Sequence, residues 1–505
     1  MPGLPRLECG AGSRSASRVR GRRIPVSGLL EREAEMALLL GRYAQAANGQ
    51  GGTVLLSGEA GMGKTSVIEH FAAALRGGPV PPSAFLVGRC DDMHTPTPLG
   101  PIHDLALLAP DPARGVLLAA RDAGTAAAAL VDLARSARSP VVFVVEDAHW
   151  ADDATLDTIR RLWRRAEHVP ALLVVTYRDE DIGYRHPARR LLGSIVGPSV
   201  TRLRLTPLTE PAVRSLAANT AVDAAELTRV SGGNPLFVTE VLGTPGAEVP
   251  PTVRDAVLGR LAGLSGAAQA VVAALSVVPS RCERWLAEAV VGTSTAGMAE
   301  AERAGVLQGD STAVWFRHEL ARRAVEASLT AAERVHHHRA VVRELVDRAA
   351  DPARLVHHAA QAGDRDMLAR HAPAAAAQAV SAGSHRQAAA HFALLLEEPD
   401  RLDPHQLAEC RASWAYSLYV INEHGAATQV AEAAVASWEQ VNDPHGLGSA
   451  LITLSMAAFW TRGPTAARRC GRPGGRVVRT TRRPGRTRSG LHRTSTRSQQ
   501  PRDAW

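Results

Sequence analysis

The most restrictive feature of this sequence is its single lysine, Lys64, in a chain that otherwise uses only arginine and histidine as basic residues. A short apolar, β-branched run at residues 53–57 comes before it, and a glycine-rich stretch leads directly into it. An apolar-periodic segment at residues 67–75 follows. This order predicts a strand, a tight loop and a helix, and therefore a domain that mixes strands with helices.

The glycine-rich stretch has the spacing G-x-x-x-x-G-K-[ST], which is typical of a loop that holds phosphate groups. Glycines let successive backbone N–H groups turn onto phosphate oxygens, and the start of a helix adds partial positive charge. We expect the Lys64 ammonium to contact the β- and γ-phosphates of ATP or ADP, and the Thr65 hydroxyl to bind Mg²⁺. A chance glycine-rich turn is the alternative. The predicted nucleotide-binding residues are Gly58, Glu59, Ala60, Gly61, Met62, Gly63, Lys64, Thr65 and Ser66.

A second apolar run, residues 141–145, ends in the acidic pair Glu146-Asp147. In open α/β sheets the carboxyl ends of the strands bind ligands, so both acids are expected beside the phosphate loop. By position, Glu146 is expected to serve Mg²⁺ through water and Asp147 to orient the attacking water. The two roles could be exchanged, because neighbouring strand residues point to opposite faces. The alternative is an acid pair on the surface after a core strand.

A third run, residues 171–176, is followed by Tyr177 and Arg178. An arginine at the end of this strand could reach the γ-phosphate and report whether it is present. The alternative is that Arg178 pairs with Asp179 or Glu180 on a loop. The predicted catalytic set is Lys64, Glu146, Asp147 and Arg178.

Runs at 84–87 and 200–205 bring the expected strands to five, alternating with helices, which predicts a parallel α/β ATPase core. Thr209 is expected to cap the next helix. After residue 210 the pattern is helical. From 351 to about 460 it is rich in alanine, with breaks at roughly repeat-length intervals that suggest paired helices stacked in an array. The run His336-His337-His338 is interpreted as a solvated helix face.

Composition excludes several classes of protein. Hydrophobic residues make up 45% and charged residues 21% of the 505, which is ordinary globular usage. No apolar run approaches the roughly 20 residues of a membrane-spanning helix, and the arginine-dotted N-terminus lacks the apolar segment of a secretory signal. We therefore expect a cytoplasmic protein without membrane contact. The five cysteines have no paired short spacing, so neither a disulfide framework nor a zinc site is indicated.

The net charge of +8 is unevenly distributed. Residues 468–505 hold 12 arginines and one acid, so the rest of the chain carries −3. This tail has few apolar residues and no helical period, so it cannot bury a core. One interpretation is an arm that binds the phosphate backbone of DNA. We favour the other, that the tail is read out of frame after a change in the coding sequence.

The order and spacing of several short runs together resemble one family: the signal-transducing ATPases with numerous domains, and among them the large ATP-binding LuxR-type, MalT-like transcription regulators. The resemblance covers about residues 29–459. The runs that carry it are Leu30–Glu35, the phosphate loop, Val145–Asp152, Thr176–Arg178, Gly233–Phe237 and Phe316–Leu320.

The resemblance implies roles for two further residues. Pro235 would pack on the adenine ring, and His318 would contact the β-phosphate of ADP and hold the resting state. The alternative for His318 is a histidine of the hydrophobic core. Family members also carry a longer helical array and a C-terminal helix-turn-helix that binds DNA, and we expect neither in this sequence.

These observations predict an α/β fold: a five-stranded parallel P-loop (AAA-like) ATPase domain, then an all-α winged-helix region and TPR-like helical repeats. The expected boundaries are a disordered segment at 1–26, the ATPase domain at 27–208, a helical lid at 209–250, the winged-helix-like domain at 251–346, the repeats at 347–462 and a disordered arginine-rich tail at 463–505.

The expected function is an ATP-dependent signalling switch with slow hydrolysis, whose nucleotide state and an inducer on the helical repeats control self-association. The inducer is a small molecule or a protein, and DNA is a partner only if the intact gene product has a helix-turn-helix. The alternatives are a phosphotransferase or motor ATPase that uses the same loop, and a DNA-associated protein that acts through its basic tail.

Overall fold

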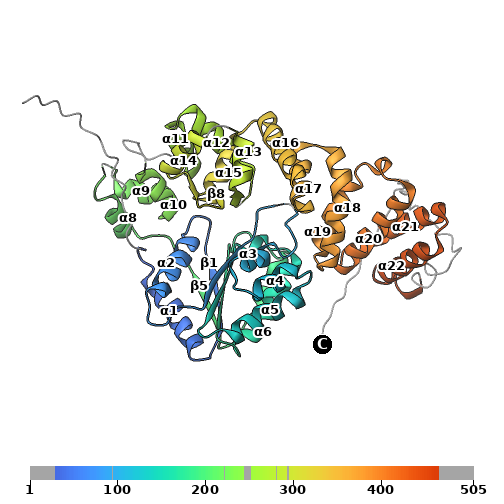
Figure 1. The fold of residues 1–505 in the computed structure, drawn as a ribbon, viewed down its shortest axis with the longest axis horizontal. Helices are drawn as coiled ribbons and strands as arrows, with labels where there is room; N and C mark the ends of the chain where they lie inside the picture. Colours follow the sequence, from blue (N-terminus) through green and yellow to red (C-terminus); the bar gives the residue numbers. More distant parts are fainter. Residues whose placement is uncertain are drawn as a thin grey trace, which may run out of the picture.

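The computed structural model of the chain describes residues 29–465 apart from residues 94, 221, 244–251, 280 and 293–294. The expected disordered N-terminal segment and nearly all of the arginine-rich tail lie outside the described residues. Figure 1 shows an α/β domain at the N-terminal end, a second lobe above it and a helical array that extends away from both.

The α/β domain is built on a five-stranded parallel sheet with the strand order β2-β3-β4-β1-β5. The prediction of five strands is confirmed. They are β1 (Gly52–Ser57), β2 (Ala84–Arg89), β3 (Val141–Glu146), β4 (Ala171–Tyr177) and β5 (Val200–Arg204). Because β1 lies between β4 and the edge strand β5, the loop that follows it emerges one strand in from the edge of the sheet.

Side chains alternate between the two faces of the sheet, as the period of a strand requires. Val54 and Leu56 of β1 pack in one core with α1 (Glu33–Ala47) and α2 (Lys64–Arg76), whereas Leu55 packs in the core of the opposite face. That second core includes residues from α3 (Gly100–Leu108), α4 (Ala113–Ala119), α5 (Ala123–Ser136), α6 (Asp153–Ala166) and α7 (Pro187–Ser194). Both faces are thus covered by helices, which is why β1, β3 and β4 are buried throughout.

Three short helices follow the sheet: α8 (Glu210–Ala217), α9 (Ala224–Ser231) and α10 (Pro235–Leu242). Thr209 is the N-cap residue of α8, as predicted, but its side chain makes no capping hydrogen bond. Instead its N–H donates to Glu31 Oε2 at 2.8 Å, and its hydroxyl also contacts that carboxylate. Arg32 donates to the carbonyl of Thr206 at 2.6 Å. Glu31 and Arg32, in the run that begins at Leu30, therefore stabilise the connection between β5 and α8.

The second lobe holds α11 (Val253–Ala262), α12 (Gly266–Ser276), α13 (Arg284–Val291), α14 (Thr295–Arg303) and α15 (Glu319–Ser328). It also holds an antiparallel three-stranded sheet that the sequence analysis did not predict. Its strands are β6 (Arg281–Glu283), β7 (Leu307–Gly309) and β8 (Ala313–Phe316), in the order β6-β8-β7. Strands of three or four residues are too short to show a period of their own, so the sequence pattern reads as helical throughout.

The C-terminal region is helical, as predicted. Its helices are α16 (Ala331–Asp347), α17 (Pro352–Ala362), α18 (Arg365–Ser381), α19 (His385–Leu395), α20 (Pro404–Val420), α21 (His424–Val441) and α22 (Pro444–Arg462). Each packs against the next along the chain, and small residues such as Ala372 and Ala376 fill the contacts. Gly363 and Gly383 end α17 and α18 in left-handed conformations that favour glycine.

The interpretation of residues 336–338 as a solvated face is wrong for His338. Its ring is buried and lies 2.9 Å, from Nδ1 to Nδ1, from His358 on α17. His336 remains exposed. The helix is amphipathic here, so only one of three consecutive histidines faces the neighbouring helix. Among the described residues, no group of three or more His, Cys, Asp or Glu could hold a metal ion.

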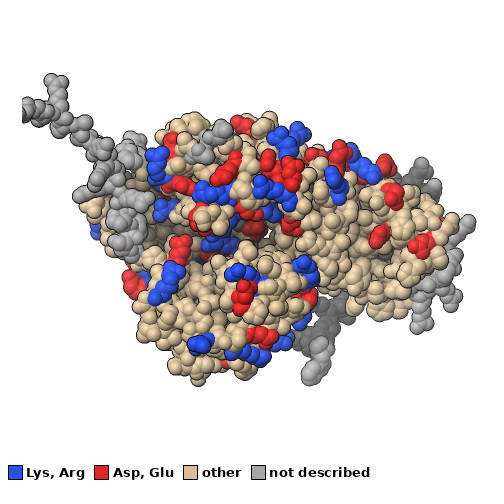
Figure 2. All heavy atoms as spheres, viewed as in Figure 1, with Lys and Arg blue, Asp and Glu red and all other residues tan. Residues whose placement is uncertain are grey.

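The described helices include none with the length and apolar character needed to cross a bilayer. Figure 2 shows side chains of both charges gathered where the lobe of α11–α15 faces the α/β domain.

Candidate nucleotide-binding site

The loop between β1 and α2 folds around the lysine side chain. Gly61 and Gly63 have φ angles of 83° and 88°, which glycine adopts without strain. The Lys64 Nζ atom donates to the carbonyl of Gly58 at 2.6 Å and to that of Glu59 at 3.0 Å. Burial lowers the pKa of Lys64, and the nearby Asp147 carboxylate opposes this shift. The ammonium is therefore held inside the loop, within the electrostatic influence of Asp147, the acid that follows β3.

The beginning of α10 holds the outer side of the same loop. Asn234 Nδ2 donates to the carbonyl of Ala60 at 2.9 Å, and the Leu236 N–H donates to that of Gly61 at 3.2 Å. A Cβ atom on Gly61 would lie 2.6 Å from Asn234 Oδ1, so this approach requires glycine. Pro235 is the first residue of α10. The structure thus brings the segment of Pro235 to the phosphate loop; its contact with adenine stays a prediction.

Glu146, the last residue of β3, faces the neighbouring strand. Its Oε2 atom lies 2.8 Å from Nε of Arg89 at the end of β2, and its side chain is only 3% exposed. Arg89 and Glu146 are paired in the strand register. Sequence reasoning missed Arg89 because the partner of an acid on a parallel strand depends on the strand order.

Asp147 lies within the electrostatic influence of Arg178 and Lys64. Its backbone is left-handed, with φ of 55°, and its N–H donates to Thr176 Oγ1 at 3.0 Å. Burial, followed by the charge of Glu146, raises the pKa of Asp147 to about 6, while Arg178 and Lys64 oppose the shift. The two adjacent acids therefore occupy different environments: Glu146 is ion-paired, and Asp147 lies near the two cations of the site.

Arg178 follows β4 and is 6% exposed. Its guanidinium carbon lies 4.8 Å above the Trp150 ring, and Nη1 lies 3.7 Å from Asp181 Oδ2. The alternative pairing with Asp179 or Glu180 is wrong. Asp179 lies near Arg204 at 3.8 Å, and Glu180 accepts a hydrogen bond from the Ala60 N–H at 2.9 Å. Sequence reasoning did not foresee that Glu180 would contact the phosphate loop.

His149 lies beside these acids and was not predicted. Its side chain is fully buried, with Nε2 3.4 Å from Asp181 Oδ2 and Nδ1 4.0 Å from Asp147 Oδ1. Burial, with the charges of Arg178 and Lys64, lowers its pKa far below the ordinary value. The ring is therefore neutral at physiological pH and offers hydrogen-bonding atoms rather than charge.

His318 comes directly before α15 and faces α10. Its Nε2 atom lies 3.7 Å from Glu240 Oε1, and Arg260 Nη1 lies 2.8 Å from Glu240 Oε2. Burial lowers the pKa of His318 to about 3, and the charges of Arg317 and Arg260 contribute. Its side chain is 29% exposed, so it is not a residue of the hydrophobic core. A contact with a β-phosphate stays a prediction.

The donor atoms around the loop fit a magnesium ion. The Thr65 hydroxyl lies in the first turn of α2, the carboxylate of Glu146 ends β3, and Asp147 follows it. The carboxyl ends of the parallel strands β1 and β3 lie at the same edge of the sheet. All are oxygen donors of the kind that Mg²⁺ prefers. The buried carboxylate oxygens of Glu146 have no hydrogen-bond donor other than the ion-paired Arg89.

The segment that follows these acids contacts both C-terminal parts of the molecule. Arg323 of α15 lies over the Trp150 ring at 4.9 Å, and its Nη2 atom lies 2.5 Å from Asp92 Oδ2. Asp152 caps α6 and also accepts a 2.8 Å hydrogen bond from the Ser384 hydroxyl beside α19. Long-range contacts of this kind leave no signal in the sequence.

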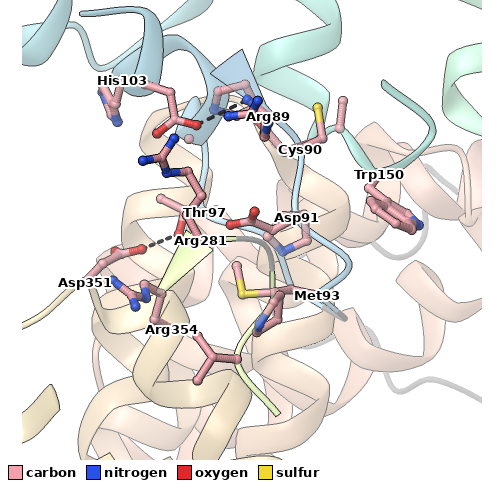
Figure 3. A pocket seen from close by; sticks show the side chains of 18 of the residues that line it. Arg89, Cys90, Asp91, Met93, Thr97, His103, Trp150, Arg281, Asp351 and Arg354 are labelled. Carbon is pink, nitrogen blue, oxygen red and sulfur yellow. Dashed lines mark hydrogen bonds between the residues drawn. The ribbon is translucent and has the colours of Figure 1, made fainter. Parts of the chain in front are cut away.

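A cavity of about 260 Å³ is lined by residues of the α/β domain, of the second lobe and of the helical array. Figure 3 shows Arg89, Cys90 and Asp91 on one side, with Arg281 and Arg354 on the other. The arginines have acidic partners: Arg89 pairs with Glu146, Arg281 with Asp310 and Arg354 with Glu283. The cavity therefore adjoins the acid pair at the end of β3 through Arg89.

One comparison, with known protein families, agrees with this geometry. Residues 28–175 match the AAA ATPase domain family. Among curated proteins no significant match is found.

Among solved structures, one similar chain is a Signal Transduction ATPase with Numerous Domains (STAND) protein with a tetratricopeptide repeat sensor from Pyrococcus horikoshii. It is 14% identical with a TM-score of 0.48, and the match covers 88% of this chain and 70% of that one. The Orc1 protein of Aeropyrum pernix, solved in complex with DNA, is 16% identical with a TM-score of 0.33, over 60% of this chain and 93% of that one.

The Walker-type ATPase of Pyrococcus abyssi is 13% identical with a TM-score of 0.32, over 59% of this chain and 96% of that one. These similarities are distant, so the assignment depends on the family match and on the geometry of the loop. Residues 28–175 therefore form a nucleotide-binding P-loop domain of the AAA ATPase type.

Proposed function

We infer that the protein is an ATP-dependent signalling switch of the LuxR-type, MalT-like regulator kind, with slow hydrolysis that resets it. One observation carries this inference: the short segment after the β3 acids is held at Trp150 by α15 and at Asp152 by the helical array. A movement of Glu146 or Asp147 would therefore reach α15 and the helical array through only a few residues.

The contacts explain how nucleotide state would reach the second lobe. The Trp150 ring contacts two arginines, Arg178 at 4.8 Å and Arg323 at 4.9 Å from its centre. Arg178 belongs to the site, and Arg323 belongs to α15. If Arg178 turns toward a γ-phosphate, Trp150 loses one of its two cationic neighbours, and the packing of α15 against the ATPase domain changes with it. Such a switch requires ligands that bind the two arrangements unequally.

Roles for the site residues follow from their surroundings. Lys64 and the loop amides would hold the β- and γ-phosphates, and Thr65 with Asp147 would hold Mg²⁺. Bound magnesium would neutralise charge that develops on the phosphates. Glu146, held by Arg89, would have to leave that ion pair before it could orient a water molecule. This requirement favours slow hydrolysis.

The remaining parts of the proposal concern the resting and active states. Pro235 would contact adenine from the start of α10, and His318 would approach the β-phosphate of ADP by a shift of α15 toward the loop. An inducer would bind the helical array α16–α22, and the ATP form would associate with itself. Contact with promoter DNA would need a helix-turn-helix in the intact gene product.

The test is the mass of the protein in solution with each nucleotide, measured by sedimentation velocity with Mg²⁺. Self-association that is stronger with a non-hydrolysable ATP analogue than with ADP is expected, and Lys64→Ala should abolish the difference. Equal association in the two nucleotides, with nucleotide binding demonstrated, would exclude a nucleotide-controlled switch.

A further inference from the structure

The loop that follows β4 places a carboxylate on the phosphate loop. Glu180 Oε1 accepts a hydrogen bond from the Ala60 N–H at 2.9 Å. Ala60 lies in the G-x-x-x-x-G-K-T stretch, between Gly58 and Lys64. The amides of such a stretch are the groups that bind phosphate oxygens. The Glu180 carboxylate is therefore bound to an amide that a phosphate oxygen could otherwise bind.

The two acids next to Glu180 in the sequence have other partners. Asp179 lies near Arg204 at 3.8 Å, and Asp181 lies near Arg178 at 3.7 Å. Of the three consecutive acids at 179–181, Glu180 is the one that contacts a backbone amide of the phosphate loop. Its charge also acts on Lys64, together with those of Asp147 and Asp181.

The other side of the loop is fixed independently. Asn234 and Leu236 hold the carbonyls of Ala60 and Gly61 from the side of α10. The peptide groups around Ala60 are thus held from two sides. Their carbonyls accept hydrogen bonds from the start of α10, and the Ala60 amide donates to Glu180 in the loop after β4. A phosphate oxygen that approaches this amide meets the Glu180 carboxylate and must displace it.

The direction of approach indicates which phosphate is affected. Glu180 lies two residues after Arg178, at the carboxyl end of β4, which is the neighbour of β3 and its acids in the sheet. In P-loop proteins the metal ion held by an acid at such a strand end also contacts the terminal phosphate. The terminal phosphate is therefore expected to lie toward Glu146 and Asp147, at the end of β3. Repulsion between the carboxylate and the nucleotide is therefore stronger for a third phosphate than for the first two.

We propose that Glu180 is a specificity-determining residue that competes with the γ-phosphate for the Ala60 amide and so lowers the affinity for ATP relative to ADP. The inference rests on the nucleotide-binding role proposed above. Glu180 is exposed, so the loop can release it without opening a core. Binding of ATP would then move the same loop that carries Arg178.

The experiment compares ATP-analogue and ADP affinities of the full chain by isothermal titration with Mg²⁺, for the native sequence, Glu180→Ala, Glu180→Gln and Asp179→Asn. Glu180→Ala is expected to raise the affinity for the ATP analogue about threefold to tenfold. The variant removes one solvent-exposed hydrogen bond to a charged group, which the nucleotide would otherwise have to break. ADP affinity is expected to change less than twofold. Glu180→Gln keeps an acceptor for the amide but loses the charge, so it should give a smaller gain.

Asp179→Asn is the matched control, because it removes the same charge from the adjacent position without touching the phosphate loop. It should leave the ratio of the two affinities unchanged. If Glu180→Ala weakens ATP binding, or raises both affinities equally, Glu180 does not discriminate between the nucleotides and the inference is wrong. If the native protein binds neither nucleotide, the proposed function itself fails.

Discussion

The Ser384 hydroxyl donates a 2.8 Å hydrogen bond to the carboxylate of Asp152, a residue 232 positions earlier in the chain. Both side chains are buried, with Ser384 0% and Asp152 1% exposed. Next to this contact, the Arg386 N–H donates to Asp153 Oδ2 at 3.3 Å, and the two side chains are ion-paired. The helical array is thus joined to the first turn of α6, five residues beyond the acids of the nucleotide site.

Replacing Ser384 with alanine is expected to weaken this junction. The buried Asp152 carboxylate would lose one of its donors, at a cost of about 1–2 kcal/mol in the free energy of unfolding. Denaturant titration followed by tryptophan fluorescence measures the change. Ser381→Ala is the control, because that hydroxyl bonds only within its own helix, to the Gln378 carbonyl. Equal stability of the two variants would contradict a contribution from the junction.

Loss of the single lysine is expected to remove nucleotide binding while the fold is kept. Lys64→Ala should lower ATP affinity by at least about tenfold, which is about 1.4 kcal/mol. Lys64→Arg keeps the charge but replaces a compact ammonium with a planar group, and the buried space around Nζ should not admit it. Fluorescent-nucleotide titration with circular dichroism tests both variants. ATP affinity that is undiminished in Lys64→Ala would contradict the assignment of the loop.

The ion pair at the ends of β2 and β3 is expected to stabilise the domain. Arg89→Ala would leave the nearly buried Glu146 carboxylate without its partner and should cost about 1–3 kcal/mol, since Arg89 is partly exposed. Adding Glu146→Gln should recover part of the loss in a double-mutant cycle.

Arg204→Ala is the control for the loss of an arginine, because its pair with Asp179 is exposed. A loss below about 0.5 kcal/mol is expected there. If Arg89→Ala is no more harmful than Arg204→Ala in denaturant titration, the pair at the end of β3 has no structural importance.

The environment of Asp147 predicts a pH dependence of stability. Its pKa is raised to about 6 from an ordinary value of 3.8, mainly by burial. Between about pH 4 and pH 6 the folded chain therefore holds a proton that the unfolded chain has released, so this group lowers stability as pH rises through that window. Asp147→Asn is expected to stabilise the protein at pH 7.5 by about 1–3 kcal/mol and to have little effect near pH 4. Unfolding free energies at the two pH values test this, and equal effects at both would contradict it.

The local features of the ATPase domain could be predicted from the sequence. The strand before Gly58, the glycine loop and the helix that starts at Lys64 lie where the spacing placed them. The acids at 146 and 147 end the strand that the apolar run predicted. These features depend on glycine conformation and on the period of side chains along a strand, both of which are encoded over a few neighbouring residues.

The sequence by itself determined the phosphate loop, the five strands and the helical C-terminal region, because each depends on short-range patterns. The tertiary structure alone decided which acid pairs with Arg89, which carboxylate meets the Ala60 amide and where Ser384 contacts the ATPase domain. Those contacts depend on strand order and on the docking of separate parts, so they join residues whose separation in the chain carries no pattern. A hydrogen bond between residues 152 and 384 requires the whole intervening fold to be in place.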